Sequence, residues 1–245
     1  RSKSGKPNLN DWLVFANECR KEGQYEVSID AYNFILGYKI NSNMAGKALL
    51  GLAQTFEDQI IPAHESHLIP YFFDNNLFFE DPFQVNSSIS PEHLESSLAL
   101  YDSLLISLPK SPLLAEAYFR LSEIKYRILH DFDQAYNLLH KAMQNRPDKR
   151  LRLKIVLRIA DVLMAKGQSK EALMFLKRQL KQNYLPAIEQ KMILVHFLTD
   201  DPDSTMKIVQ SSFITMSPID PSFNDLMELK NILTQYYNNE PSGKI

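Results

Sequence analysis

The 245-residue sequence contains one cysteine, seven glycines and almost no net charge, and each scarcity excludes a class of protein. The single Cys19 excludes an internal disulfide, although it does not identify a cellular compartment. The low glycine content argues against glycine-rich phosphate loops and favours helices. Lys and Arg number 27 against 29 Asp and Glu, so no overall charge attracts nucleic acid or an anionic membrane. No run of 18 apolar residues is present, so no membrane span is expected.

Apolar and small residues recur at helical spacing, and the pattern itself repeats along the chain. The anchors of the first helix in each repeat are 37, 69 and 38 residues apart: Phe15, Leu52, Leu121 and Ile159. The anchors of the second helix are 69, 38 and 37 residues apart: Ser28, Ser97, Ala135 and Ala172. A fixed period in this range is typical of stacked helical hairpins. The interval of 69 is one period plus an insertion of about 32 residues.

The clearest copy of the pattern, residues 10–42, has a tryptophan, a small residue, a glycine between the helices and an aromatic residue at fixed spacing. These are Trp12, Ala16, Gly23 and Tyr32. With these residues the sequence resembles the tetratricopeptide repeat family over about residues 10–217. The resemblance implies an all-α fold, a right-handed α-α superhelix of four to five helical hairpins.

The repeats have expected boundaries along the chain. Hairpins are expected at about 10–42, 45–110, 112–147 and 149–184, followed by a degenerate copy at 185–219 and a terminal capping helix at 221–237. Together they would form a single solenoid domain at 9–237, between a disordered tail at 1–8 and a second tail at 238–245. Glycine residues Gly23 and Gly167 are expected to end helices.

Core packing follows from the same template. Trp12, Phe15 and Tyr32 are expected to be largely buried between the first helical pair and its neighbour. Cys19 stands at a core-facing position, so it is expected to be a buried small apolar residue rather than a reactive thiol.

The resemblance places a concave groove along the first helix of each hairpin. Two ladders of residues are expected to line it, one apolar and one amide or acidic: Leu13, Leu50, Phe119 and Leu157, and Asn17, Gln54, Glu123 and Asp161. Such a groove suits a peptide or helix of another protein. A groove that is only solvated, or is filled by the insertion, is an equal alternative. Some family members clamp a terminal carboxylate, but Leu13 stands where the clamp needs lysine.

The insertion at 60–91 holds four prolines, six aromatic residues and no Lys or Arg. Its aromatic residues need a surface to pack against, and they are candidate contacts: Tyr71, Phe72, Phe73, Phe78, Phe79 and Phe83. Three interpretations remain open. The insertion packs across its own groove or flank, docks a partner, or mediates self-association.

No catalytic arrangement is recognisable, and neither a cofactor nor a metal is expected. His64 and His67 lack the further ligands of a zinc site. The basic region 145–182 is interpreted as a solvated helix face rather than an RNA surface. The sequence therefore predicts a non-enzymatic scaffold for protein–protein interaction. A permanently packed subunit of a cell-envelope or organelle assembly is the alternative, and an RNA-binding helical repeat is the third.

Overall fold

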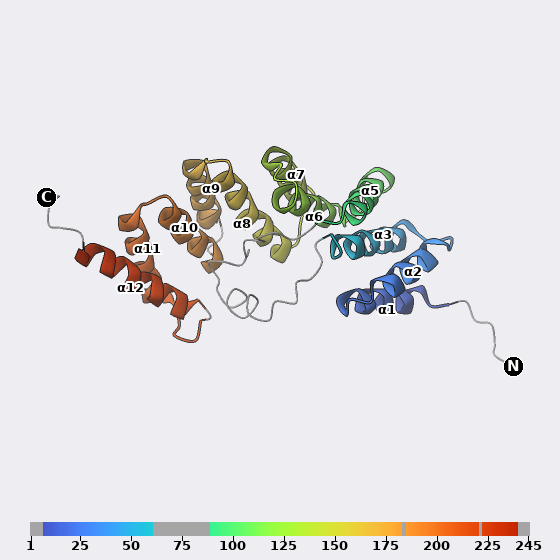
Figure 1. Cartoon of the computed structure of the whole chain (residues 1–245), viewed down its shortest axis with the longest axis horizontal. Coiled ribbons are helices and arrows are strands. Elements are labelled where there is room, and N and C mark those ends of the chain that lie inside the picture. The colour runs from blue at the N-terminus through green and yellow to red at the C-terminus, as the bar shows by residue number, and fades with distance from the viewer. Residues whose placement is uncertain (1–6, 61–88, 183–184, 221, 240–245) are drawn as a thin grey trace. The chain divides into compact units, whose positions relative to one another are not determined.

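The computed structural model describes residues 7–60, 89–182, 185–220 and 222–239 (Figure 1). This part of the chain contains eleven α-helices and no strand, so the predicted all-α class is confirmed. The helices are α1 (Leu9–Lys21), α2 (Tyr25–Leu36), α3 (Ser42–Glu57), α5 (Pro91–Ser107), α6 (Leu114–Arg127), α7 (Phe132–Gln144), α8 (Lys149–Ala165), α9 (Ser169–Gln182), α10 (Pro186–Leu198), α11 (Pro202–Thr215) and α12 (Phe223–Asn239).

The chain divides into two compact units, and the boundary falls within α8, between Ile155 and Val156. The described part of the first unit holds helices α1 to α7 and the start of α8. The second holds the rest of α8 and helices α9 to α12. A single domain over 9–237 stays a prediction.

Two glycines end helices as the sequence predicts. Gly23 follows α1 with a φ of 75°, and Gly167 follows α8 with a φ of 72°. Both angles lie in the left-handed region, which glycine enters without the steric cost of a Cβ atom. Both turns therefore reverse the chain into the second helix of a pair.

Hydrogen bonds from two serines show that the first two pairs share one register. The Ser28 hydroxyl of α2 donates to the carbonyl of Ala16 in α1 at 3.0 Å. The Ser97 hydroxyl of α5 donates to the carbonyl of Ala53 in α3 at 3.1 Å. Small residues at these positions let the two helices of a pair approach closely. The repeat therefore fixes the packing of each hairpin.

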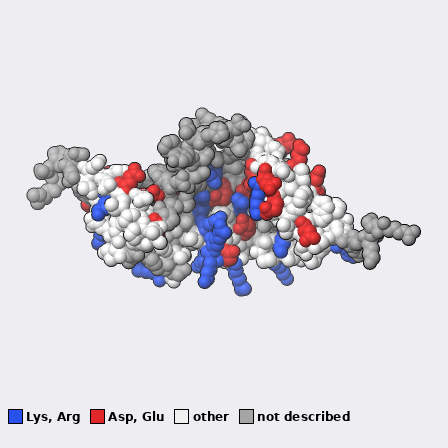
Figure 2. Space-filling view, turned by 90° about the horizontal axis from the view of Figure 1, so that it is seen from below, with Lys and Arg blue, Asp and Glu red and all other residues white. Residues whose placement is uncertain are grey.

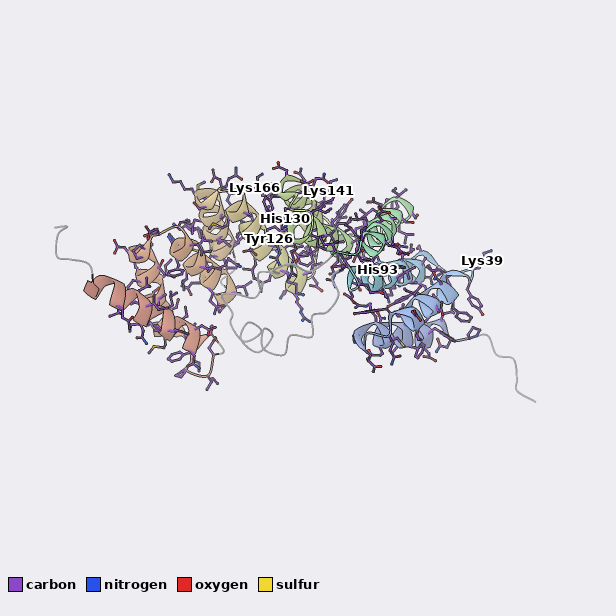
Figure 3. All side chains as sticks on the ribbon, in the orientation of Figure 1. Lys39, His93, Tyr126, His130, Lys141 and Lys166 are labelled. Carbon is purple, nitrogen blue, oxygen red and sulfur yellow. The ribbon has the colours of Figure 1, made fainter. Side chains whose placement is uncertain are left out.

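Neighbouring pairs in the first unit pack through large side chains. Tyr32 of α2 is completely buried, as predicted, and its ring lies against the backbone of α3. A Cβ atom at Gly51 would lie 2.3 Å from the ring carbon Cζ of Tyr32, so only glycine allows this approach. Within the pair α3–α5, His93 at the start of α5 lies beside Phe56 with ring centroids 6.1 Å apart (Figure 3).

The ends of the insertion meet within the first unit. The backbone N–H of Ser90 donates to the carbonyl of Ile60 at 2.8 Å, so the pair α3–α5 closes across the intervening residues. Ile60 is completely buried and belongs to the core, which places it outside the insertion predicted to start there. The aromatic residues predicted as contacts, from Tyr71 to Phe83, lie outside the described residues.

In the second unit, α12, the last of the described helices, packs against α11. Its apolar residues join a cluster with α10 and α11: Ile193, Val209, Leu226, Leu229 and Leu233. The rings of Phe213 and Phe223 meet edge to face with centroids 5.3 Å apart. The last helix therefore covers apolar surface of the preceding pair.

Burial in the first pair agrees only in part with the prediction. Cys19 is buried, as expected. Trp12 is 36% exposed and Phe15 is 47% exposed, so the prediction that both are largely buried is wrong. At the position of Phe15, the later residues Leu52 and Leu121 are covered by a preceding helix, and among the described residues no helix precedes α1.

Candidate protein-binding surface

In the first unit, the residues predicted to line the groove lie on successive first helices. Leu13 on α1 and Leu50 on α3 are half-buried, because each packs its inner side against an apolar cluster. Gln54 lies one turn after Leu50 and is also half-buried. This arrangement leaves part of each side chain accessible. Contact of these residues with a partner stays a prediction.

Asn17 on α1 is engaged by its own hairpin. Its side-chain Nδ2 donates to the carbonyl of Leu13 at 2.7 Å, and its Oδ1 accepts from the Tyr32 hydroxyl at 2.8 Å. These bonds orient the amide toward α2. Asn17 is therefore better suited to fixing the hairpin than to clamping a terminal carboxylate.

Phe119 was predicted to line the groove, but its side chain is only 7% exposed. Helix α6 is buried over most of its circumference: Leu114, Ala115, Ala117, Phe119, Leu121, Ser122 and Ile124 are all buried. The ring of Phe119 therefore lies mostly in the interior and contributes little surface to the face of α6. Glu123, one turn further along, is half-buried.

Ion pairs join the first helices of the first unit to one another. Arg20 of α1 pairs with Asp58, the residue that follows α3, at 2.7 Å. Arg120 of α6 pairs with Glu57 of α3 at 3.2 Å and with Glu116 of its own helix at 3.4 Å. The pairs between helices could not be predicted from the sequence, because the two residues of each pair lie 38 and 63 residues apart. The sequence feature that could have indicated these ion pairs is the presence of opposite charges on successive first helices.

Glu57 is the most enclosed charge in this network. Its carboxylate also accepts a hydrogen bond from the Tyr101 hydroxyl of α5. Burial raises the pKa of Glu57 above its usual range, and the Arg120 guanidinium only partly offsets this effect. Burial and the neighbouring Glu57 raise the pKa of Tyr101 well above 10. The group therefore joins three helices, α3, α5 and α6.

The second unit has a corresponding ion pair between its first helices. Asp161 of α8 accepts from Arg158 at 3.2 Å and from Lys191 of α10 at 2.8 Å. Leu157, one turn before Asp161, is half-buried. Figure 2 shows acidic and basic side chains next to each other near the middle of the face in view.

Among the described residues, no group of three or more His, Cys, Asp or Glu side chains could hold a metal ion. None of the helices of Figure 1 is long and apolar enough to cross a membrane. A small pocket of about 130 Å³ lies between α10, α11 and the residues before α12. Its polar residues include Glu189, Gln190 and Asp220, and its size suits a side chain rather than a cofactor.

Comparisons with known proteins agree with the repeat pattern. A sequence model of the tetratricopeptide repeat matches residues 127–192. No curated protein matches the sequence.

Solved structures share the fold. A crystal structure of MamA has a TM-score of 0.52 at 15% identity, with 90% of this chain and 97% of that chain covered. Another structure of MamA has a TM-score of 0.51 at 15% identity, covering 97% and 98%. A thermophilic TPR protein of Thermus thermophilus, TTC0263, has a TM-score of 0.49 at 15% identity, covering 93% and 99%. At this identity the likeness to MamA shows the fold alone.

Proposed function

We propose that this chain, which matches the tetratricopeptide repeat model over residues 127–192, is a non-enzymatic scaffold that binds a segment of another protein. The binding surface is the face of the first helices α1, α3 and α6 of the first unit. The bound segment is a peptide in extended or helical form. The fold itself is that of proteins which present such faces, and the residues of this chain define what the face accepts.

The observation that carries this proposal is the row of half-buried residues on consecutive first helices of the first unit. Leu13 and Leu50 offer apolar contacts, and Gln54 offers both an amide donor and an acceptor. Their inner sides are held by the core, so they are positioned before a partner binds. A segment with apolar anchors and a backbone able to pair with an amide fits this row.

The ion pairs on the same face limit the partner's charge. Arg20 is paired with Asp58, and Arg120 with Glu57, so these charges neutralise each other within the face. Binding that rests on apolar and amide contacts should depend only weakly on salt. A partner with a largely uncharged, apolar motif is therefore favoured over a strongly acidic or basic one.

The experiment uses affinity capture with the full chain, followed by mass spectrometry and a titration with the captured partner. Gln54→Lys places a bulky charge on the proposed face. Ile106→Lys, on the outer surface of α5 where Ile106 is 79% exposed, is the matched control. We expect Gln54→Lys to weaken partner affinity by about tenfold, or 1.4 kcal/mol, at an unchanged melting temperature.

The control should retain the partner in the same experiment. Equal capture by the wild type and Gln54→Lys, with both folded, would show that binding does not use this face. Loss of the partner in both variants would point to a nonspecific effect of added charge.

A permanently packed subunit of a larger assembly remains the second candidate. The observation in its favour is the exposed apolar surface outside the groove, with Ile106 on α5 and Ile214 on α11. In that case the isolated chain would bind its neighbours through these outer residues, and Ile106→Lys rather than Gln54→Lys would release them.

A further inference from the structure

The outward face of α1 has no covering helix among the described residues, and its composition differs from the covered faces. Asp11, Phe15 and Glu18 lie four and seven residues apart, so they share one side of the helix. All three are exposed. A large aromatic ring between two carboxylates therefore faces outward.

The equivalent positions in later pairs show which kind of structural element packs against this face. In α3, 37 residues on, the same side is Ala48, Leu52 and Thr55, and in α6 it is Ala117, Leu121 and Ile124. These six residues are buried. In α3 they face α2, and in α6 they face α5, so a helix covers this side in both pairs. The exposed side of α1 thus has the form of a helix-binding surface.

A helix that covers the outward side of α1 must differ in chemistry from α2 and α5, which cover the same side of α3 and α6. Asp11 and Glu18 replace residues that are apolar or uncharged elsewhere, so the incoming helix has to bring cations about two turns apart. Val14 stands where α3 has Gly51, whose lack of a side chain lets Tyr32 approach closely. The incoming helix must therefore remain further from α1 and reach it with long side chains.

One helix of this chain presents that pattern on its outer side. Lys170, Met174 and Lys177 on α9 have the same spacing of four and seven residues. All three are exposed, Met174 by 60%. Residues 145–182, which include α9, hold eleven Lys and Arg against three Asp and Glu, while the rest of the chain is acidic. Charge and spacing on α9 are thus complementary to those on α1.

We propose that the outward face of α1 binds the outer face of α9 from a second copy of this chain. With the helices parallel, Asp11 meets Lys170, Phe15 meets Met174 and Glu18 meets Lys177. Glu18 already accepts from Lys21 at 2.9 Å, and its other oxygen remains available to a second ammonium group. The thioether of Met174 against the ring of Phe15 is a favourable contact.

The contact joins two different surfaces, so after pairing one copy keeps a free α9 face and the other keeps a free α1 face. Association of this kind continues from copy to copy unless the geometry closes a ring. Exposed ion pairs are screened within about 10 Å at 0.1 M salt, so the association should be weak and should decrease as salt increases. It is independent of the groove, and its failure leaves the proposed scaffold function untouched.

Sedimentation velocity of the full chain over a range of concentrations tests the proposal at low and at high salt. One variant, Asp11→Lys with Glu18→Lys, reverses the charges on α1. A second, Lys170→Glu with Lys177→Glu, reverses those on α9. We expect the wild type to associate at low salt, and each variant alone to associate at least tenfold more weakly.

Mixing the two variants supplies the decisive result. In the mixture the unaltered α1 of one variant meets the unaltered α9 of the other, and reversed α1 meets reversed α9, so the mixture should regain association although each variant alone associates weakly. Circular dichroism checks that both are folded, and the milder pair Asp11→Asn with Glu18→Gln replaces the first variant if it is not. A wild type that stays monomeric at low salt overturns the proposal and leaves α1 to a helix of another protein. Association that both reversals leave unchanged, or that mixing does not restore, overturns it as well.

Discussion

The first and second helical pairs follow the same template, yet the residue at the same position has opposite surroundings in the two. Phe15 on α1 is exposed, whereas Leu52 on α3 is almost completely buried. Both helices place this residue on the same side, and only α3 has a preceding second helix against that side. Burial at this position is therefore a property of the neighbouring pair rather than of the residue or its own helix.

The same contrast extends to residues one turn away. Where α1 has Val14, α3 has Gly51, and where α1 has the carboxylates of Asp11 and Glu18, α3 has Ala48 and Thr55. The residues of α3 are small enough for a helix to approach closely, whereas those of α1 keep a helix at a greater distance. The uncovered side of α1 thus differs in its residues from the covered side of α3 once the repeats are aligned.

The largest expected effect is at the junction of the two pairs. Tyr32→Ala removes a completely buried ring and its hydrogen bond to Asn17, so it should lower the free energy of unfolding by about 3–5 kcal/mol. Phe15→Ala, on the exposed side, should cost less than about 1 kcal/mol. Urea unfolding followed by circular dichroism measures both.

Tyr32→Phe is the control for the hydroxyl alone and should cost about 1 kcal/mol. Equal losses for Tyr32→Ala and Phe15→Ala would contradict the comparison, because they would mean that the face of α1 is buried in solution.

Much of the fold could be predicted from the sequence, because the anchors recur at a fixed period. The small residues Ser28 and Ser97, the helix ends at Gly23 and Gly167, and the burial of Tyr32 and Cys19 all follow from one template. These features depend on contacts within a hairpin or between adjacent hairpins, which the repeat itself encodes.

The candidate surface could be predicted less well, because it depends on partners distant in the sequence. Whether Phe119 faces outward is decided by how fully α6 is enclosed, and a single helix does not show this. The pair between Glu57 and Arg120 joins residues 63 apart across two helices. Trp12 and Phe15 were expected to be buried because the template assumes a neighbour on each side.

A smaller effect is expected where the two pairs differ in side-chain size. In Gly51→Ala the new methyl group would meet the Tyr32 ring, so the helices must separate or the ring must move. Overpacking of this kind costs about 1–3 kcal/mol, although alanine recovers up to about 1 kcal/mol of helix propensity. We expect a net loss of about 1–2 kcal/mol in thermal or urea unfolding.

Val14→Ala at the equivalent position of α1 is the matched variant and should change stability by less than about 0.5 kcal/mol. A stabilised Gly51→Ala would show that α2 and α3 are less closely packed than the structure indicates.

An effect of similar size at pH 7, which becomes smaller on acidification, concerns the charges that join the pairs. Arg120→Met leaves the enclosed carboxylate of Glu57 without its cation and should cost about 1–2 kcal/mol at pH 7, discounted for the partial exposure of Arg120. The folded-state pKa of Glu57 is already raised by burial, and loss of Arg120 raises it further. A raised carboxyl pKa stabilises the fold at low pH, and this stabilisation is lost as the pH rises through the folded-state value. The difference in the free energy of unfolding between wild type and Arg120→Met should therefore be largest at neutral pH and shrink toward pH 5.

Arg20→Met, whose partner Asp58 is more exposed than Glu57, is the control and should cost less than about 1 kcal/mol. Urea unfolding at several pH values measures both, and a cost for Arg120→Met that grows on acidification would contradict the role assigned to Glu57.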